Sequence, residues 1–293
     1  MLTDQDLEPP RRTAFAVGYR MLGTIDDAED IAQEVVARLS RATEPIANRD
    51  AWATTVATRL SIDVLRSARA QRESYIGTWL PEPLLHDPSP GPAARAELAD
   101  SLSQALLVAL ERLTPVERAA FLLRDVFDYD YGQIAPIIDR TEANARQLVT
   151  RARKHVEAGR PRFDADEQAR DRLFEQFLQA VDDGDLGGLE SMLAEDVVLW
   201  GDGGGKVLSA RIPVEGLANV ARFLVHSTRW RRKHGTDLSS EVVLVNGQPG
   251  QVLRSEDGAV FAVVSVDISG GRITAIRMMR NPDKLGHVGP AAA

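Results

Sequence analysis

The chain has 293 residues, more than a typical domain of about 100 to 200 residues needs, so we expect two or three domains. Its hydrophobic fraction of 44% and charged fraction of 27% are ordinary for globular proteins, and no apolar run reaches the roughly 18 residues of a membrane span. The absence of cysteine excludes disulfides, thiolate zinc sites and cysteine nucleophiles, and the net charge of −8 argues superficially against nucleic acid as a partner.

The composition also bears on location and on metals. The start of the chain, MLTDQDLEPPRR, does not resemble a signal peptide, so we expect a cytoplasmic protein that does not associate with membranes. The five histidines lack the i, i+4 spacing that places two ligands on one helical face. We therefore expect no metal site and no cofactor.

The first part of the chain is predicted to be helical, because apolar residues recur every three or four positions from residue 11 to 72. Gly23 is expected to cap the first helix, and Asp26 with Glu29 resembles a capping box that begins the second. A third helix is predicted over residues 50–72, after a loop with the sequence TEPIAN.

The segment 77–96 is predicted to be a linker, because it holds five prolines. It also carries apolar side chains that are costly to leave in water: Trp79, Leu80, Leu84 and Leu85. We therefore expect an extended strip that docks on a protein surface.

Residues 97–163 are predicted to form a helix-turn-helix. Thr114, Pro115 and Glu117 give an N-cap, a proline at the first helical position and a capping box. Asp130 and Gln133 repeat the cap before a short helix, and Thr141 can cap a longer one that ends near residue 158.

Two short basic segments stand out in this acidic chain. Residues 146–162 carry six Arg or Lys against one acid, and residues 59–72 carry four Arg against Asp63. In the last helix of the predicted helix-turn-helix, the side opposite the apolar residues Ala145, Leu148, Val149 and Ala152 should expose a polar set. Arg pairs with guanine and Gln with adenine in the major groove, so this pattern favours direct base readout. The alternative from this pattern alone is a solvated arginine-rich helix.

After residue 163 the pattern changes to an α+β domain, in which a concave sheet wraps around helices. Helices are predicted over residues 165–181, 186–193 and 214–228. Strands are predicted over residues 197–200, 206–212, 241–247, 251–255, 260–269 and 272–280, which are rich in β-branched residues and bounded by Gly or Asp turns.

Three segments resemble a known family. DDAEDIAQEVVARL (26–39), DAWATTVATRLSIDVLRSARAQR (50–72) and LTPVERAAFLLRDVFDYDYGQIAPIID (113–139) are similar to regions two and four of sigma-70 factors of the extracytoplasmic-function group, group IV. The resemblance implies transcription initiation, with core RNA polymerase, through its β′ clamp helices and β flap, and promoter DNA as partners.

The resemblance also assigns residues to roles. The residues implied at the core polymerase interface are Asp27, Asp30, Gln33 and Glu34. Those implied at the −10 element are Arg59, Asp63, Arg66 and Arg69, with the TEPIAN loop capturing a flipped base. Those implied at the −35 element are Thr141, Arg146, Gln147, Thr150, Arg151 and Lys154.

The turn before the last of these helices departs from the family pattern. It usually contains glycine, whereas here it reads Ile138-Asp139-Arg140. We therefore expect Asp139 to adopt the left-handed conformation.

The C-terminal part resembles a SnoaL-type cone, which only certain sigma factors carry. WLPEP (79–83), DGGGK (202–206) and NPDKL (281–285) are similar to signature motifs of the SigJ-like group. We expect a regulatory contact between the linker, the C-terminal tail and this domain. Its residues are Trp79, Leu80, Pro81, Glu82, Pro83, Asp202, Gly203, Gly204, Gly205, Lys206, Asn281, Pro282, Asp283, Lys284 and Leu285.

The predicted protein is therefore multidomain, with two all-α helical domains followed by an α+β cone-like SnoaL-type domain. The predicted boundaries are 1–76 for region two, 77–96 for the linker, 97–163 for region four and 164–293 for the SnoaL-like domain. We expect no enzymatic activity and no catalytic residue.

Two alternatives stay open from the residues. The cone could be an enzyme, with Asp202, His226, Trp200 and Asp237 as candidates, or could hold a small-molecule ligand as a signal. The whole chain could instead be a helix-turn-helix transcription regulator with a ligand-sensing or enzymatic SnoaL-like domain. That alternative leaves residues 11–72 without a role.

Overall fold

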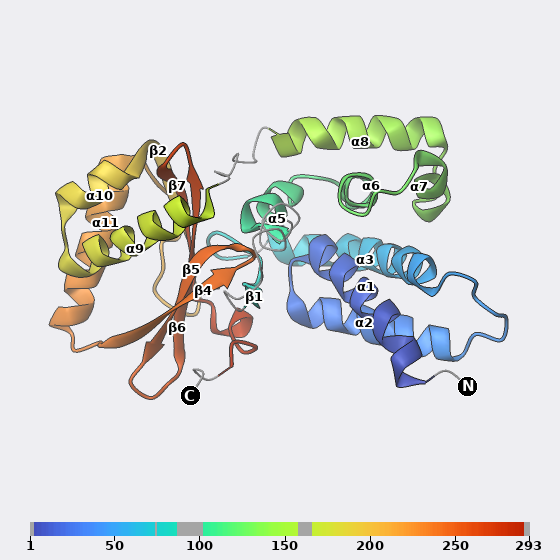
Figure 1. Ribbon diagram of the computed structural model, residues 1–293, viewed down its shortest axis with the longest axis horizontal. Coiled ribbons are helices and arrows are strands. Elements are labelled where there is room, and N and C mark those ends of the chain that lie inside the picture. The colour runs from blue at the N-terminus through green and yellow to red at the C-terminus, as the bar shows by residue number, and fades with distance from the viewer. Residues whose placement is uncertain (1–2, 74, 87–101, 158–165, 290–293) are drawn as a thin grey trace. The chain divides into compact units, whose positions relative to one another are not determined.

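The computed structural model describes residues 3–73, 75–86, 102–157 and 166–289, and packing divides the chain into two compact units (Figure 1). The helical unit comprises residues 1–74 and 106–160, and the C-terminal unit comprises residues 75–105 and 161–293. Packing therefore joins segments that are far apart in the chain. The sequential boundaries given above stay a prediction.

The helical unit begins with three helices that lie against one another (Figure 1). They are α1 (Asp4–Leu22), α2 (Ile25–Ser40) and α3 (Arg49–Glu73). Gly23 ends α1 as predicted, with φ 75° and its N–H donating to the Tyr19 carbonyl at 2.8 Å. A Cβ at Gly18 would lie 3.1 Å from the Ala28 Cα, so a glycine permits the close approach of α1 and α2.

The predicted start of α2 was wrong. The helix begins at Ile25 with Thr24 as its N-cap residue, two positions before Asp26. The Thr24 hydroxyl donates to the Asp27 carboxylate one turn into the helix.

The helix-turn-helix of the helical unit consists of α6 (Pro115–Asp125), α7 (Tyr131–Ile137) and α8 (Glu142–Glu157). The predicted capping box of α6 is present, with the Thr114 N–H donating to Glu117 Oε2 at 3.2 Å. Helix α5 (Gln104–Leu110) precedes them in the chain. Asp139 has φ 55°, which confirms the left-handed turn before α8.

The C-terminal unit is a seven-stranded sheet with helices. Its strands are β1 (Leu85–His86), β2 (Leu193–Asp202), β3 (Val214–Glu215), β4 (Leu238–Val245), β5 (Gln248–Ser255), β6 (Val260–Ser269) and β7 (Arg272–Met279). The order is β1-β4-β5-β6-β7-β2-β3, with β2 and β7 parallel and the other neighbours antiparallel. The helices are α9 (Glu167–Asp183), α10 (Leu186–Met192) and α11 (Leu217–Lys233), followed after the sheet by the 3-10 turn η1 (Pro282–Lys284).

Both faces of the central strand β6 are buried. Val264, Val266 and Ile268 point to the core that α9 and α11 form with the sheet. On the other face, the Ser265 hydroxyl donates to Gln104 Oε1 at 2.7 Å. The unit is thus the predicted α+β cone, and Gln104 of α5 contacts its second face.

The prediction of a strand over residues 206–212 was wrong. The chain turns after β2 at Gly204 and Gly205, which have φ of 59° and 71°, and only Val214–Glu215 returns to pair with β2. Leu208 and Ile212 in the intervening segment are exposed. The segment therefore lacks the buried side chains that would stabilise a strand against the sheet.

Candidate nucleic-acid interface and interdomain strap

Helix α8 presents the polar set that the sequence predicted. Its inner side is buried through Ala145, Leu148, Val149 and Ala152. The Thr141 hydroxyl accepts the Asn144 N–H at 3.3 Å and so caps the helix. All six residues that the resemblance implies at the −35 element are exposed: Thr141, Arg146, Gln147, Thr150, Arg151 and Lys154. One side of α8 therefore offers a continuous row of hydrogen-bond donors.

Several arginines of this row are already paired. Arg146 contacts Glu142 at 2.5 Å and stacks over the Tyr131 ring at 4.5 Å, and Arg151 contacts Glu117 at 3.3 Å. Both arginine side chains are more than half exposed, so each pair is worth about 1 kcal/mol or less and can exchange for a phosphate or a base. The intramolecular partners hold the guanidinium groups on the outer face of α8.

The outer side of α2 is acidic. Asp27, Asp30 and Gln33 are exposed, and Glu34 is half-buried beside Arg38 at 2.7 Å. All residues of the TEPIAN loop except Ile46 are exposed, and Asn48 Oδ1 caps α3 by accepting the Ala51 N–H at 3.0 Å.

The residues assigned to the −10 element lie on α3 in different surroundings. Arg59 donates to the carbonyls of Pro136 at 2.8 Å and Ile137 at 3.2 Å, at the C-terminal end of α7. Asp63 and Arg66 are exposed and pair at 3.3 Å. Arg69 belongs to α3, and its side chain falls outside the described part of the chain. The structure therefore brings Arg59 to the helix-turn-helix and leaves Asp63 and Arg66 in solvent.

The sequence did not indicate this packing of α3 and α1 against the helix-turn-helix. Arg118 of α6 is 3% exposed, donates to the Met21 carbonyl at 2.6 Å and pairs with Glu111 at 2.8 Å. This buried arginine therefore links α6 to the C-terminal end of α1 through the Met21 carbonyl. Its only sequence signal is a charged residue on the apolar side of α6.

Residues 75–86, which we call the strap, lie in the C-terminal unit and are bound there by side chains. The carboxylate of Asp202 accepts the Tyr75 hydroxyl at 2.5 Å and the Leu80 N–H at 2.9 Å. Lys284 donates to the same carboxylate, to Asp202 Oδ2 at 2.8 Å, and also to the Leu80 carbonyl at 2.6 Å. Leu80 itself is 1% exposed. The hydrogen bonds of Tyr75, Leu80, Asp202 and Lys284 form what we call the junction.

The junction brings together all three motifs that the sequence singled out. The ammonium of Lys284 lies 4.3 Å from the Trp79 ring, and Asn281 donates to the Tyr75 hydroxyl at 3.0 Å. A Cβ at Gly204 would lie 2.5 Å from Asn281 Cγ, so this close approach needs a glycine. Lys206 and Asp283 add an exposed ion pair at 2.5 Å.

The rest of the strap extends the sheet. Leu85 and His86 pair antiparallel with β4, and Asn246 Oδ1 accepts the Leu84 N–H at 3.0 Å. His287 bonds the Pro83 carbonyl at 2.8 Å. The Tyr75, Asn246 and His287 contacts were not predicted, because none of these residues lies in a motif.

Comparison with known proteins decides the family. Residues 10–71 match the family model of Sigma-70 region 2, and residues 103–156 match that of Sigma-70, region 4. The chain is 35% identical over 290 residues to the ECF RNA polymerase sigma factor SigJ of Mycobacterium tuberculosis, covering 96% of this chain and 92% of the relative. The chain belongs to the ECF RNA polymerase sigma factors.

Two further comparisons agree with this assignment. The sigma factor is 32% identical over 280 residues to the probable ECF RNA polymerase sigma factor SigI of Mycobacterium tuberculosis, covering 92% of this chain and 90% of the relative. It also matches the crystal structure of Mycobacterium tuberculosis SigJ with a TM-score of 0.77 at 32% identity, covering 97% of this chain and 98% of that one. The likeness spans the C-terminal SnoaL-like unit as well as both helical regions. As a member of the family, the sigma factor binds core RNA polymerase and promoter DNA and directs transcription initiation.

The residues weighed for catalysis do not share a site in the sigma factor. Asp202 is bound in the junction, and Trp200 stacks with Arg277 at 5.4 Å. His226 lines the pocket of the cone, whereas Asp237 lines a separate, shallower surface pocket. Arg277 and Asp267 form a buried ion pair at 2.8 Å that the sequence did not reveal.

Among the described residues of the sigma factor, no group of three His, Asp or Glu side chains could hold a metal ion. None of the described helices is long and apolar enough to cross a membrane.

Proposed function

We propose that the sigma factor reads the −35 element with α8 and the −10 element with α3, and that the strap and the C-terminal unit control this activity in cis. The exposed row from Thr141 to Lys154 carries the first part. Its Arg and Gln side chains suit base edges and Lys154 suits a phosphate, while the buried side of α8 keeps the row rigid.

On this proposal the acidic side of α2 docks on the β′ clamp helices, through Asp27, Asp30, Gln33 and Glu34, and region four meets the β flap. An acidic helix attracts a basic surface, which favours fast association and correct orientation. The exposed TEPIAN loop is suited to hold an unstacked base of the opened promoter.

Control in cis is supported by Arg59. Its guanidinium already donates to the Pro136 and Ile137 carbonyls of α7, so this contact competes with the −10 element for part of its hydrogen-bonding capacity. We expect the helix-turn-helix to move away from α3 when Arg59 binds the −10 element. The strap connects these two segments in the chain, and the junction binds it to the C-terminal unit. A covalently attached unit acts at high effective concentration without needing high affinity.

Reconstituted transcription with core RNA polymerase tests the regulatory part. We expect Trp79→Ala, and separately deletion of residues 281–293, to change the amount of promoter-specific transcript, because each weakens the junction. A chain that ends near Phe163 should change it in the same direction. The circular dichroism of the helical unit should be preserved. Unchanged transcription in all three variants would refute control by the strap.

The −35 assignment is tested with the double variant Arg146→Ala and Gln147→Ala. Loss of base contacts should cost about 1 to 3 kcal/mol of discrimination and relax the preference at the −35 positions read. Arg172→Ala, an exposed arginine on α9, is the matched control and should leave the preference intact. Equal loss in both variants would mean that only net charge matters.

We also propose a cytoplasmic location and no enzymatic activity. The relatives are RNA polymerase sigma factors, and of the four side chains considered for catalysis only His226 lines the pocket of the cone.

A further inference from the structure

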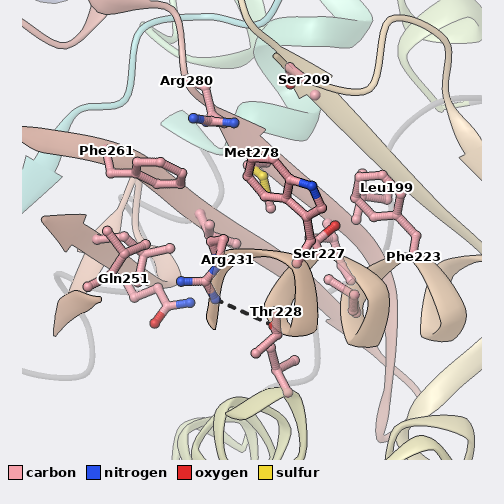
Figure 2. A pocket seen from close by; sticks show the side chains of 18 of the residues that line it. Leu199, Ser209, Phe223, Ser227, Thr228, Arg231, Gln251, Phe261, Met278 and Arg280 are labelled. Atoms are coloured by element: carbon pink, nitrogen blue, oxygen red, sulfur yellow. Dashed lines mark hydrogen bonds between the residues drawn. The ribbon is translucent and has the colours of Figure 1, made fainter. Parts of the chain in front are cut away.

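The cone of the C-terminal unit encloses a pocket of about 630 Å³ (Figure 2). Pockets of about 300 to 1,000 Å³ hold small organic molecules. The walls are mainly aromatic and aliphatic, and include Phe177, Leu199, Phe223, Phe261 and Met278. Such a wall favours an apolar body over a sugar or a nucleotide.

One wall comes from a stripe along α11. Phe223, Ser227 and Arg231 are four residues apart, so they lie one above another on the face of the helix that lines the pocket. The helix runs beyond residue 228, where the sequence pattern had ended it, and this extra turn places Arg231 in the pocket.

Two guanidinium groups, from separate elements, line the pocket (Figure 2). Arg231 donates to the Thr228 hydroxyl at 3.4 Å, and Arg280, just after β7, donates to the Leu208 carbonyl and lies 3.9 Å from the Phe261 ring. Among the described residues, neither has an ion pair with a carboxylate. The single carboxylate that lines this pocket in the described chain is Asp182, which is exposed at the end of α9.

The surroundings of the two guanidinium groups disfavour their positive charges. Burial lowers the pKa of Arg231, and Arg232 lowers it further, while Asp182 opposes the shift. Burial also lowers the pKa of Arg280, and the charge of Arg231 lowers it further. Two half-buried cations that repel each other are stabilised by an anion that contacts both.

Further polar groups at the pocket need a partner. Arg280 Nε and the Ser209 hydroxyl are buried and form no hydrogen bond with the described residues, and both residues line the pocket. Buried polar groups in proteins are nearly always hydrogen-bonded. A negatively charged oxygen would satisfy these donors.

We propose that the pocket binds an apolar carboxylic acid in its ionised form, with the carboxylate on Arg231 and Arg280 and the hydrocarbon body against Phe177, Phe223 and Phe261. Guanidinium groups pair with carboxylates in a planar, bidentate geometry, and a single anionic head suits walls that are otherwise apolar. The proposal goes beyond promoter recognition and does not depend on how the sigma factor reads DNA.

Calorimetric titration of the full chain tests the proposal with matched pairs of probes: octanoate against 1-octanol, and 2-naphthoate against 2-naphthol. We expect at least one carboxylate to bind about tenfold or more tightly than its alcohol, because the charge-assisted bonds are absent from the alcohol. Arg231→Gln and Arg280→Gln should each weaken binding of that carboxylate by about tenfold and leave the alcohol within about threefold.

Arg232→Gln is the matched control, because Arg232 is the exposed neighbour of Arg231 on α11 and does not line the pocket. It should leave carboxylate affinity unchanged, and circular dichroism should show that all variants fold. The proposal is overturned if neither carboxylate binds, if each alcohol binds as tightly as its acid, or if Arg232→Gln weakens binding as much as Arg231→Gln does.

Discussion

At the scale of single residues, Asp202 bonds donors from three separate segments of the chain, whereas its DGGGK motif alone indicated none of them. Its carboxylate accepts hydrogen bonds from Tyr75, Leu80, Gly204 and Lys284. A carboxylate has about four lone-pair positions, so this one is fully used. Because Asp202 is 0% exposed, its charge is tolerable only with these partners.

The first prediction concerns Lys284, the cationic partner of Asp202. Lys284→Met should lower the free energy of unfolding of the C-terminal unit by about 3 to 5 kcal/mol, because it leaves a buried carboxylate without its counter-charge. Urea unfolding followed by circular dichroism measures this. The double variant with Asp202→Asn should recover part of the loss, because it removes the orphaned charge.

Lys206→Met is the matched control for this prediction. Lys206 and Asp283 form an ion pair in the same neighbourhood, but their side chains are 55% and 59% exposed. Breaking it should cost no more than about 1 kcal/mol. Equal losses in Lys284→Met and Lys206→Met would show that burial does not govern the junction.

The second prediction concerns the titration of Tyr75. Burial, the hydrogen bond to Asp202 and the Asp202 charge raise the pKa of Tyr75 well above its usual value. A raised folded-state pKa means that Tyr75 contributes stability fully below the unfolded pKa of about 10, and that this contribution is lost as the pH rises through the folded-state pKa.

Ultraviolet absorbance of tyrosinate, compared between the wild type and Tyr75→Phe, checks this shift. The two titration curves should coincide through about pH 10 to 11, because Tyr75 is still protonated there. A difference of one tyrosinate centred near pH 10 in the folded protein would contradict the hydrogen bond to Asp202.

At the scale of elements, the turn between α7 and α8 carries the third prediction. Asp139 has a left-handed φ of 55°, which costs roughly 1 kcal/mol for a residue with a Cβ. Asp139→Gly should therefore raise the stability of the helical unit by up to about 1 kcal/mol, and Asp139→Val should lower it by about 1 to 2 kcal/mol. Chemical denaturation measures both. If both variants lower stability equally, the aspartate side chain, not φ, determines the turn.

Elements with strong local signals were predicted well from the sequence. Asp139 is one example, because the resemblance to a family turn that usually contains glycine indicated a positive φ at this turn. The long strand β6 is another, since seven successive buried residues need a sheet with both faces covered. Residues 206–212 show the limit: KVLSARI has strand-like composition, but Leu208 and Ile212 face solvent and β3 pairs with the neighbouring edge of β2.

The residues of the candidate sites also divide into those that the sequence predicts and those that it does not. The exposed row on α8 follows from helical period, which a sequence displays. The contacts of Arg59 and Arg118 depend on which carbonyls lie nearby, and those of Arg231 and Arg280 depend on where two distant segments meet. Such long-range partners leave no periodic signal in a single sequence.

At the scale of the whole molecule, the order of the chain and the order of packing differ. The strap follows region two in the sequence, yet it supplies strand β1 and two residues of the junction, Tyr75 and Leu80, to the C-terminal unit. The edge strand β1 of the SnoaL-like sheet therefore lies about 80 residues before α9, the first helix of the SnoaL-like domain in the chain. Residues 75–86 therefore pack with the C-terminal unit, although region four separates them from the rest of that unit in the chain.

The fourth prediction follows from this division and compares two fragments. Residues 164–293 alone should unfold at lower urea concentration than residues 75–293, with a free energy of unfolding lower by about 3 to 5 kcal/mol, because Asp202 loses two of its partners and Leu80 no longer fills its place. A synthetic peptide of residues 75–86, added in excess to the shorter fragment, should restore most of the difference through binding.

A peptide with Leu80→Asp is the matched control and should restore little, since it puts a charge where an apolar side chain is buried. Equal urea midpoints for the two fragments would mean that the strap only rests on the C-terminal unit.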